Sequence, residues 1–273
     1  MQTQTRRLLL NIGLLLSVVG GGGYVWWQVH QPAPTTQVQL SALDKAAITR
    51  IALVRHPKSA TGETIRLVKQ GDQWQMQEPK QAAVNPVRVT QLLTLLDEKV
   101  AARYDASGKD LHQYGLEPPE NVLELNDETF VFGLDNPISH NRYVLHAGKI
   151  NLLSESVYGV LTGSALDLIA NTLVSPPRTV KQLTLPSQFT AKPETAQNWQ
   201  MADALRVEAW DGTGASQGQI TLSLDDGSTL TLDLLTAQGD LVIGNKALGI
   251  RYILPDTLRA DLFPVVASPT PSP

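Results

Sequence analysis

The sequence contains no cysteine among its 273 residues. This absence excludes a disulfide framework, a thiolate zinc site, an iron–sulfur cluster, a cysteine nucleophile and a lipid-modified cysteine anchor. Aromatic residues make up only 5% of the chain and charged residues 18%, whereas hydrophobic residues make up 42%. The composition therefore predicts a globular protein with enough apolar side chains to bury a core.

Positive charge is also scarce. The 22 Lys and Arg residues stand against 26 Asp and Glu residues, which gives a formal net charge of −4. Arg6 and Arg7 are the only charged residues before Asp44, so the rest of the chain is more acidic still. Proteins that bind nucleic acids need clustered positive charge to neutralise phosphates. We therefore predict that this chain binds no nucleic acid.

Short catalytic motifs are missing as well. The sequence has no phosphate-binding Gly-x-x-x-x-Gly-Lys-Ser/Thr, no Gly-x-Ser-x-Gly and no His-Glu-x-x-His. His140 and His146 could share a strand face near Asp135, but a metal site needs a third ligand and ordinary surface histidines are the simpler interpretation. Asp225 and Asp226 precede a glycine and are typical of a turn. We predict no catalytic residue, no metal, no cofactor and no enzymatic activity.

The N-terminus carries a long uncharged run. Residues 8–29 contain no formal charge and would form a helix of about 33 Å, enough to cross roughly 30 Å of hydrocarbon. Because Arg6 and Arg7 precede this run, the positive-inside rule predicts that residues 1–7 lie in the cytoplasm and that the main domain is periplasmic. The prediction is a single-pass protein of the inner (plasma) membrane, with a cleaved signal peptide as the alternative.

Small residues recur within this predicted transmembrane helix. Gly13, Ser17 and Gly21 are spaced every four residues, so they share one helix face. This spacing allows two transmembrane helices to approach closely, and it raises the hypothesis of a homodimer formed through this face. The alternative is that the small residues merely loosen the helix.

The remaining chain divides into three parts. Residues 30–42 contain two prolines and no formal charge, which predicts an extended linker. Residues 43–266 are patterned as one exported domain, in which a boundary near 175–185 would separate two sub-lobes. Residues 267–273 contain three prolines and are expected to be a disordered tail.

Alternating apolar and polar residues dominate the predicted domain. Hairpins are expected at residues 64–77, 121–132 and 219–235, whereas Asn85 followed by Pro86 predicts a helix start. Residues 148–161 and 249–262 share an order, namely glycine, strand, cap and short helix, which suggests a duplicated unit. The predicted class is α+β, a β-rich domain of repeated antiparallel strand and hairpin units with interspersed helices.

Three motifs carry a family resemblance. They are Trp74-x-Met-x-x-Pro79, Tyr114-Gly-Leu-Glu-Pro-Pro119 and Phe132-Gly-Leu-Asp-Asn-Pro137. Together they resemble the bacterial domain-of-unknown-function family 4340 over about residues 48–180. The resemblance implies a cell-envelope protein, commonly membrane-anchored, with an accessory role beside transporter-like components. It supplies no catalytic residues.

Five residues are candidates for contact with a partner. Two interpretations apply to Tyr114, Leu116 and Pro118, namely a rigid turn packed on the core or a contact surface. Two interpretations also apply to Trp199 and Trp210, namely core residues or interface anchors. Our first hypothesis is a non-catalytic accessory or scaffold component that binds an envelope protein. The alternatives are a periplasmic ligand-binding or glycan-sensing module and, less favoured, an envelope-polymer hydrolase.

Overall fold

The computed structural model describes residues 39–56, 62–236 and 239–265, which belong to one compact unit. The predicted transmembrane run, its small-residue face and the proline-rich tail lie outside these ranges. No helix within the described ranges is both long enough and apolar enough to span a bilayer.

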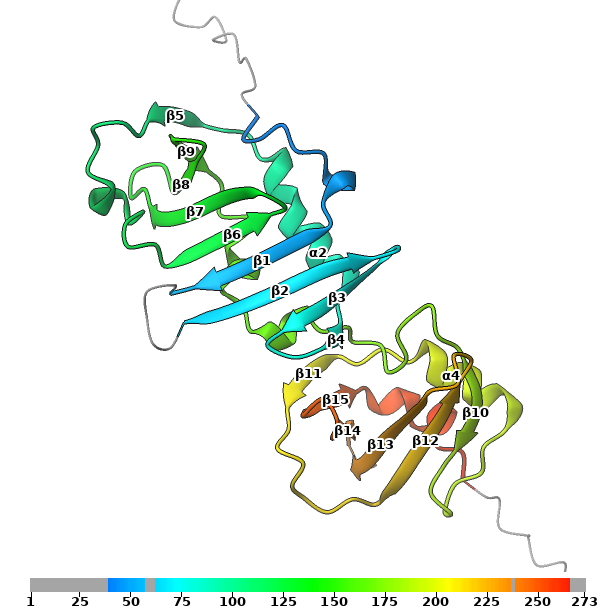
Figure 1. Cartoon of the computed structure of the whole chain (residues 1–273). Helices are drawn as coiled ribbons and strands as arrows, with labels where there is room; N and C mark the ends of the chain where they lie inside the picture. Colours follow the sequence, from blue (N-terminus) through cyan, green and yellow to red (C-terminus); the bar gives the residue numbers. More distant parts are fainter. Residues whose placement is uncertain (1–38, 57–61, 237–238, 266–273) are drawn as a thin grey trace, which may run out of the picture. The chain divides into compact units, whose positions relative to one another are not determined.

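Nine antiparallel strands form the first sheet, in the order β4-β3-β2-β1-β6-β7-β8-β9-β5 (Figure 1). The strands are β1 (Arg50–Arg55), β2 (Glu63–Gln70), β3 (Gln73–Glu78), β4 (Ala82–Ala83), β5 (Ala102–Asp105), β6 (Asn121–Leu125), β7 (Glu128–Asp135), β8 (Arg142–His146) and β9 (Lys149–Leu153). The helices in this part are α2 (Pro86–Leu93), α3 (Tyr158–Thr162) and the short 3-10 turns η1 (Lys45–Ala47), η2 (Thr94–Asp97), η3 (Leu111–Tyr114) and η4 (Ala165–Leu168).

Six antiparallel strands form the second sheet, in the order β10-β12-β13-β14-β15-β11. The strands are β10 (Val180–Thr184), β11 (Arg206–Ala209), β12 (Gly218–Leu224), β13 (Thr229–Thr236), β14 (Leu241–Asn245) and β15 (Ile250–Leu254). Its helices are α4 (Pro193–Met201), η5 (Asp256–Leu258) and α5 (Arg259–Leu262).

The two sheets repeat one topology. In the first, β1-β6-β7-β8-β9-β5 follow one another, and in the second β10-β12-β13-β14-β15-β11 do. Each series runs along the chain as strand, helix, edge strand and four-stranded meander, followed by a short helix. Strands β2 to β4 are an addition on the open side of β1. We call β1 with β5–β9 the first half and β10–β15 the second half.

Local irregularities repeat as well. The register shifts between β7 and β8 in the first half and between β13 and β14 in the second. The side-chain oxygen of Asn126, in the β6–β7 turn, accepts the amide of Arg50 at 3.1 Å. The carboxylate of Asp225, at the corresponding β12–β13 turn, accepts the amide of Thr179 at 2.9 Å. In each half, one side chain of a meander turn is thus hydrogen-bonded to the backbone at the start of β1 or directly before β10.

Helix α2 begins where the sequence predicts, because the Asn85 side chain accepts the Val87 amide and Pro86 occupies the first turn. Val89 and Leu92 are buried against the core. The α-helix ends at Leu93, and a 3-10 turn follows it.

The β-rich, antiparallel class with a few helices is confirmed. The predicted hairpins correspond to β2–β3, β6–β7 and β12–β13. Asp226 and Gly227 form the last of these turns, as predicted, with the Ser228 amide bound to the Asp226 carboxylate at 2.9 Å. The short edge strands β5 and β11 were not predicted, because most of their side chains are not buried and no alternating pattern marks them.

Candidate functional site

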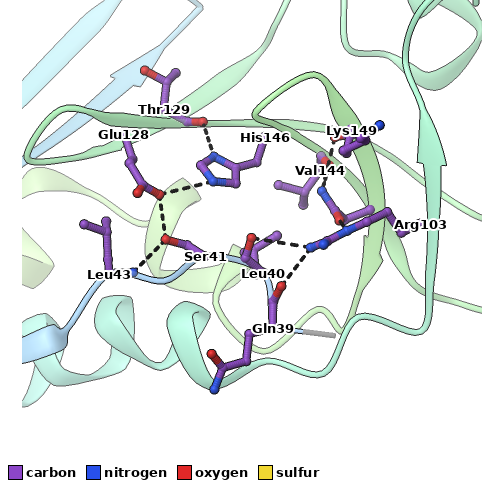
Figure 2. Close-up of polar contacts among 11 residues, drawn as sticks. Gln39, Leu40, Ser41, Leu43, Arg103, Glu128, Thr129, Val144, His146 and Lys149 are labelled. Atoms are coloured by element: carbon purple, nitrogen blue, oxygen red, sulfur yellow. Dashed lines mark hydrogen bonds and ion pairs between the residues drawn. The ribbon is translucent and has the colours of Figure 1, made fainter. Parts of the chain in front are cut away.

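Residues 39–43, here called the docked segment, lie against the first half through a polar cluster (Figure 2). The Ser41 hydroxyl donates to Glu128 Oε2 at 2.6 Å and accepts the Leu43 amide at 3.0 Å. The same carboxylate oxygen lies 3.1 Å from Nε2 of His146. One carboxylate therefore joins the docked segment to β7 and β8.

The imidazole of His146 is held on three sides. Its Nδ1 lies 3.0 Å from the carbonyl oxygen of Thr129, on the side opposite Glu128. Its ring stacks on Phe130, with 4.3 Å between centroids. Both ring nitrogens thus face oxygen acceptors, and the ring plane is set by the aromatic contact. His146 is fixed as a bridge between strands and the docked segment.

Arg103, from the edge strand β5, makes the second set of contacts (Figure 2). Its Nη2 donates to the carbonyl oxygens of Gln39 at 2.8 Å and Leu40 at 3.4 Å. Its Nε donates to Oδ1 of Asn151 at 2.6 Å. Asn151 is fully buried, and its amide group donates to backbone carbonyls of β8 and β9. Arg103 therefore satisfies a buried polar group and the backbone of the docked segment together.

The docked segment is also tied by apolar packing and backbone pairing. The Leu40 side chain is buried in the core, and Gln39 forms an isolated antiparallel bridge with Lys99. Residues 39–42, which the sequence pattern placed in the extended linker, thus belong to the folded domain.

The serine, histidine and carboxylate of this cluster do not form a nucleophile relay. In such a relay the imidazole lies between the hydroxyl and the carboxylate and removes the hydroxyl proton. Here the carboxylate of Glu128 lies between Ser41 and His146 and accepts from both. These contacts therefore hold the docked segment against β7 and β8.

The Tyr114-Gly-Leu element is packed on β7. Gly115 adopts a left-handed conformation, with φ of 66°, and Leu116 is 2% exposed. Tyr114 contacts Tyr143 edge-on at 5.0 Å between centroids. A Cβ at Gly133 would lie 2.2 Å from the Tyr114 carbonyl, so only glycine fits beneath this turn. Leu116 offers no surface to a partner, whereas the following prolines line an open surface cavity.

That surface cavity measures about 530 Å³. It is lined by His56, His112, Glu117, Pro118, Glu120 and Leu134, among others. Of the candidate partner residues in this motif, Pro118 is the one the structure places on the cavity wall.

The two tryptophan candidates have different environments. Trp199, in α4, is fully buried, and its Nε1 donates to the Leu262 carbonyl at 3.0 Å. It therefore presents no contact surface. Trp210 is half-buried, its Nε1 donates to the Thr213 carbonyl at 2.7 Å, and its ring lies over Gly244 of β14. Trp210 also lines an open cavity of about 540 Å³ with Arg251.

Within the described ranges, His140 and His146 belong to no group of three His, Asp or Glu side chains that could hold a metal ion. His146 is engaged by Glu128 and Thr129. The side chains of the docked cluster were missed by sequence reasoning, because they come from separate strands and share no motif.

The family comparison can be set beside this geometry. A family model described as a domain of unknown function (DUF4340) matches residues 74–236, from β3 to the end of β13. The chain belongs to this family. The match confirms the resemblance of the DUF4340 motifs and extends it beyond residue 180 into the second half. Searches of curated proteins and of solved structures give no match.

Proposed function

We propose that this DUF4340 protein is a single-pass, inner-membrane protein whose exported domain is a non-catalytic accessory or scaffold component of an envelope or transporter-like assembly. The docked segment is the observation that carries the proposal. Its contacts, made by Ser41, Leu40 and the Arg103 side chain, fix the end of the predicted linker on the first half.

The remaining tether is short. Only residues 30–38 separate the predicted transmembrane run from Gln39. Nine extended residues reach at most about 30 Å, so the docked edge of the first half would stay near the bilayer surface. Holding a domain so close to the membrane raises its effective concentration towards membrane partners.

The first half also presents apolar side chains for a partner. Leu134, at the end of β7, is 51% exposed and lines the cavity that contains Pro118. Ile138, in the β7–β8 connection, is 90% exposed. Exposed apolar side chains beside a cavity are typical of protein contact surfaces. These residues support a protein partner in the envelope.

The absence of native cysteine allows a direct topology test. A single Ile138→Cys substitution in the full chain should react with a membrane-impermeant maleimide in spheroplasts, because the side chain is exposed. A cysteine at Gln4 should react only after the membrane is lysed. Labelling with the opposite sidedness, or a mature N-terminus near residues 20–24, would contradict the anchor.

The partner is tested by site-specific photo-crosslinking in membranes. A photoreactive residue at Leu134 should capture one consistent membrane protein. The same residue at Met201, which is 71% exposed on the second half, serves as the matched control and should not capture it. Equal capture from both positions, or none from Leu134, would contradict this contact surface.

A ligand-binding module is the second candidate function. A cavity lined by Tyr252 favours it.

A further inference from the structure

A cavity of about 510 Å³ lies beside β15, and its wall combines polar and apolar residues, including Gln75 and Ala82 of β3 and β4. Its apolar wall includes Ile169, Leu173, Leu230 and Leu248. This volume falls within the usual range of small-molecule sites, which combine apolar walls with a few polar groups.

Asn245 and Tyr252 are both buried polar residues of this wall, and the Asn245 side-chain oxygen accepts the Leu248 amide at 3.1 Å. Tyr252 is 4% exposed, and no described residue forms a hydrogen bond with its hydroxyl. Burial raises the pKa of Tyr252 to about 12, so the hydroxyl keeps its proton at neutral pH. The hydroxyl is therefore free to donate a hydrogen bond to an acceptor atom of a molecule in the cavity.

Arg178 is the one charged side chain in the cavity wall, which contains no carboxylate. Within the described ranges, its guanidinium forms neither an ion pair nor a hydrogen bond. Its charge acts at longer range on Tyr252 and helps to lower the pKa of Asp226. An unpaired guanidinium beside a neutral hydroxyl donor favours an anion.

The first half shows how the same position is satisfied by a side chain of the neighbouring strand. Asn151 and Tyr252 occupy equivalent places, three residues after the glycine that precedes β9 and β15. Asn151 pairs in register with Arg103 of β5, which binds it, whereas Tyr252 pairs with Val207 of β11. Val207 has no polar group, so the Tyr252 hydroxyl remains available.

We infer that this cavity binds a carboxylate attached to an apolar body, with Arg178 and the Tyr252 hydroxyl as donors to the carboxylate. A single positive charge matches a monoanion better than a phosphate dianion. Free organic acids and the C-terminus of a peptide share this chemistry. The inference deepens the second candidate function and does not depend on the membrane tether.

The test measures binding to the purified full chain by titration calorimetry. The probes are octanoate, octanamide as its neutral counterpart, octyl phosphate, and a tripeptide ending in leucine as either the free acid or the amide. We expect saturable binding of octanoate or of the free-acid peptide, and at least tenfold weaker binding of each corresponding amide. Whichever acid binds more tightly identifies the source of the carboxylate.

Variants then assign the donors. Arg178→Gln should weaken acid binding at least tenfold and Tyr252→Phe about threefold or more, whereas Lys181→Gln, which removes a nearby exposed charge, should leave it unchanged. Circular dichroism should show that all three variants remain folded. Absence of saturable binding, equal binding of acids and amides, tighter binding of octyl phosphate, or unchanged affinity in Arg178→Gln would each overturn the inference.

Discussion

The two halves of the molecule share a strand order but satisfy their buried polar groups differently. In the first half, Arg103 binds the buried Asn151 and the backbone of the docked segment. In the second half, the equivalent Tyr252 faces a cavity that contains the unpaired Arg178. One strand order can therefore bind a buried polar side chain to a neighbouring strand, as at Asn151, or leave it facing a cavity, as at Tyr252.

The halves also differ in whether their first strand lies at the edge of its sheet. Strands β2 to β4 cover β1 in the first half, whereas β10 remains an edge strand in the second. The connection between β5 and β6 buries Leu116, whereas the shorter connection between β11 and β12 leaves Trp210 half-exposed. More of the core of the first half therefore depends on its connections.

The largest expected effect concerns these connections. Leu116→Asp should lower the free energy of unfolding by several kcal/mol, about 3–5, because it buries a charge without a partner. Leu116→Met should cost less than about 1.5 kcal/mol, since it keeps a similar apolar volume. Urea unfolding of the full chain measures both. An unchanged midpoint in Leu116→Asp, with loss of a binding partner, would make the segment an interface.

The next effect concerns alkaline stability. Burial raises the pKa of Tyr252 to about 12, above its ordinary value of 10.0. The contribution of the neutral Tyr252 side chain to the free energy of unfolding is therefore fully present below pH 10, and it is lost as the pH rises towards 12. A shift of about two units corresponds to about 2–3 kcal/mol. Tyr252→Phe should remove this loss, as read from urea midpoints between pH 9 and 12. Parallel curves for the two proteins would contradict the buried environment.

A smaller effect is expected in the docked cluster. Arg103→Gln should lower the free energy of unfolding by about 2 kcal/mol, because the buried Asn151 oxygen loses its charged donor. Arg206→Gln in the second half is the control, since its ion pair with Glu208 is exposed and should contribute less than about 1 kcal/mol. Equal effects of the two substitutions would show that the docked segment adds nothing to stability.

The smallest expected effect concerns the turn hydrogen bonds made by Asn126 in the first half and Asp225 in the second. The hydrogen bond from Thr179 lowers the pKa of Asp225, so this carboxylate stabilises the fold above its ordinary pKa of 3.8, and the contribution is lost as pH falls through the lowered value. Asn126, the equivalent residue in the first half, carries no charge. Asp225→Asn should therefore flatten the acid side of the stability profile. An unchanged profile would contradict the link.

The sequence predicted elements that depend on neighbouring residues. The Asn85–Pro86 helix start and the alternating strands of 219–235 were both recognised, because their signals lie within a few residues. The order of glycine, strand, cap and short helix at 148–161 and 249–262 was also visible, and it lies in equivalent parts of the two halves.

The parts that depend on distant pairing were not predicted. The docked segment has Leu40 as its one buried apolar residue before Leu43, so no period marks it as folded. Ser41 and Glu128 are 87 residues apart, and Arg103 and Asn151 are 48 apart. Arg178 and Tyr252 are likewise far apart in the sequence and come to line one cavity only in the folded chain.

Hydrogen–deuterium exchange of the full chain, with and without saturating octanoate, tests the difference between the halves most directly. We expect residues 39–43 to be protected in both states, because Ser41 and the backbone of Gln39 and Leu40 are bound to the first half. Residues 170–178 and 247–249, around the cavity beside Tyr252, should gain protection only with octanoate. Free exchange of residues 39–43 in both states, together with no change around the cavity, would contradict both the docked segment and the ligand site.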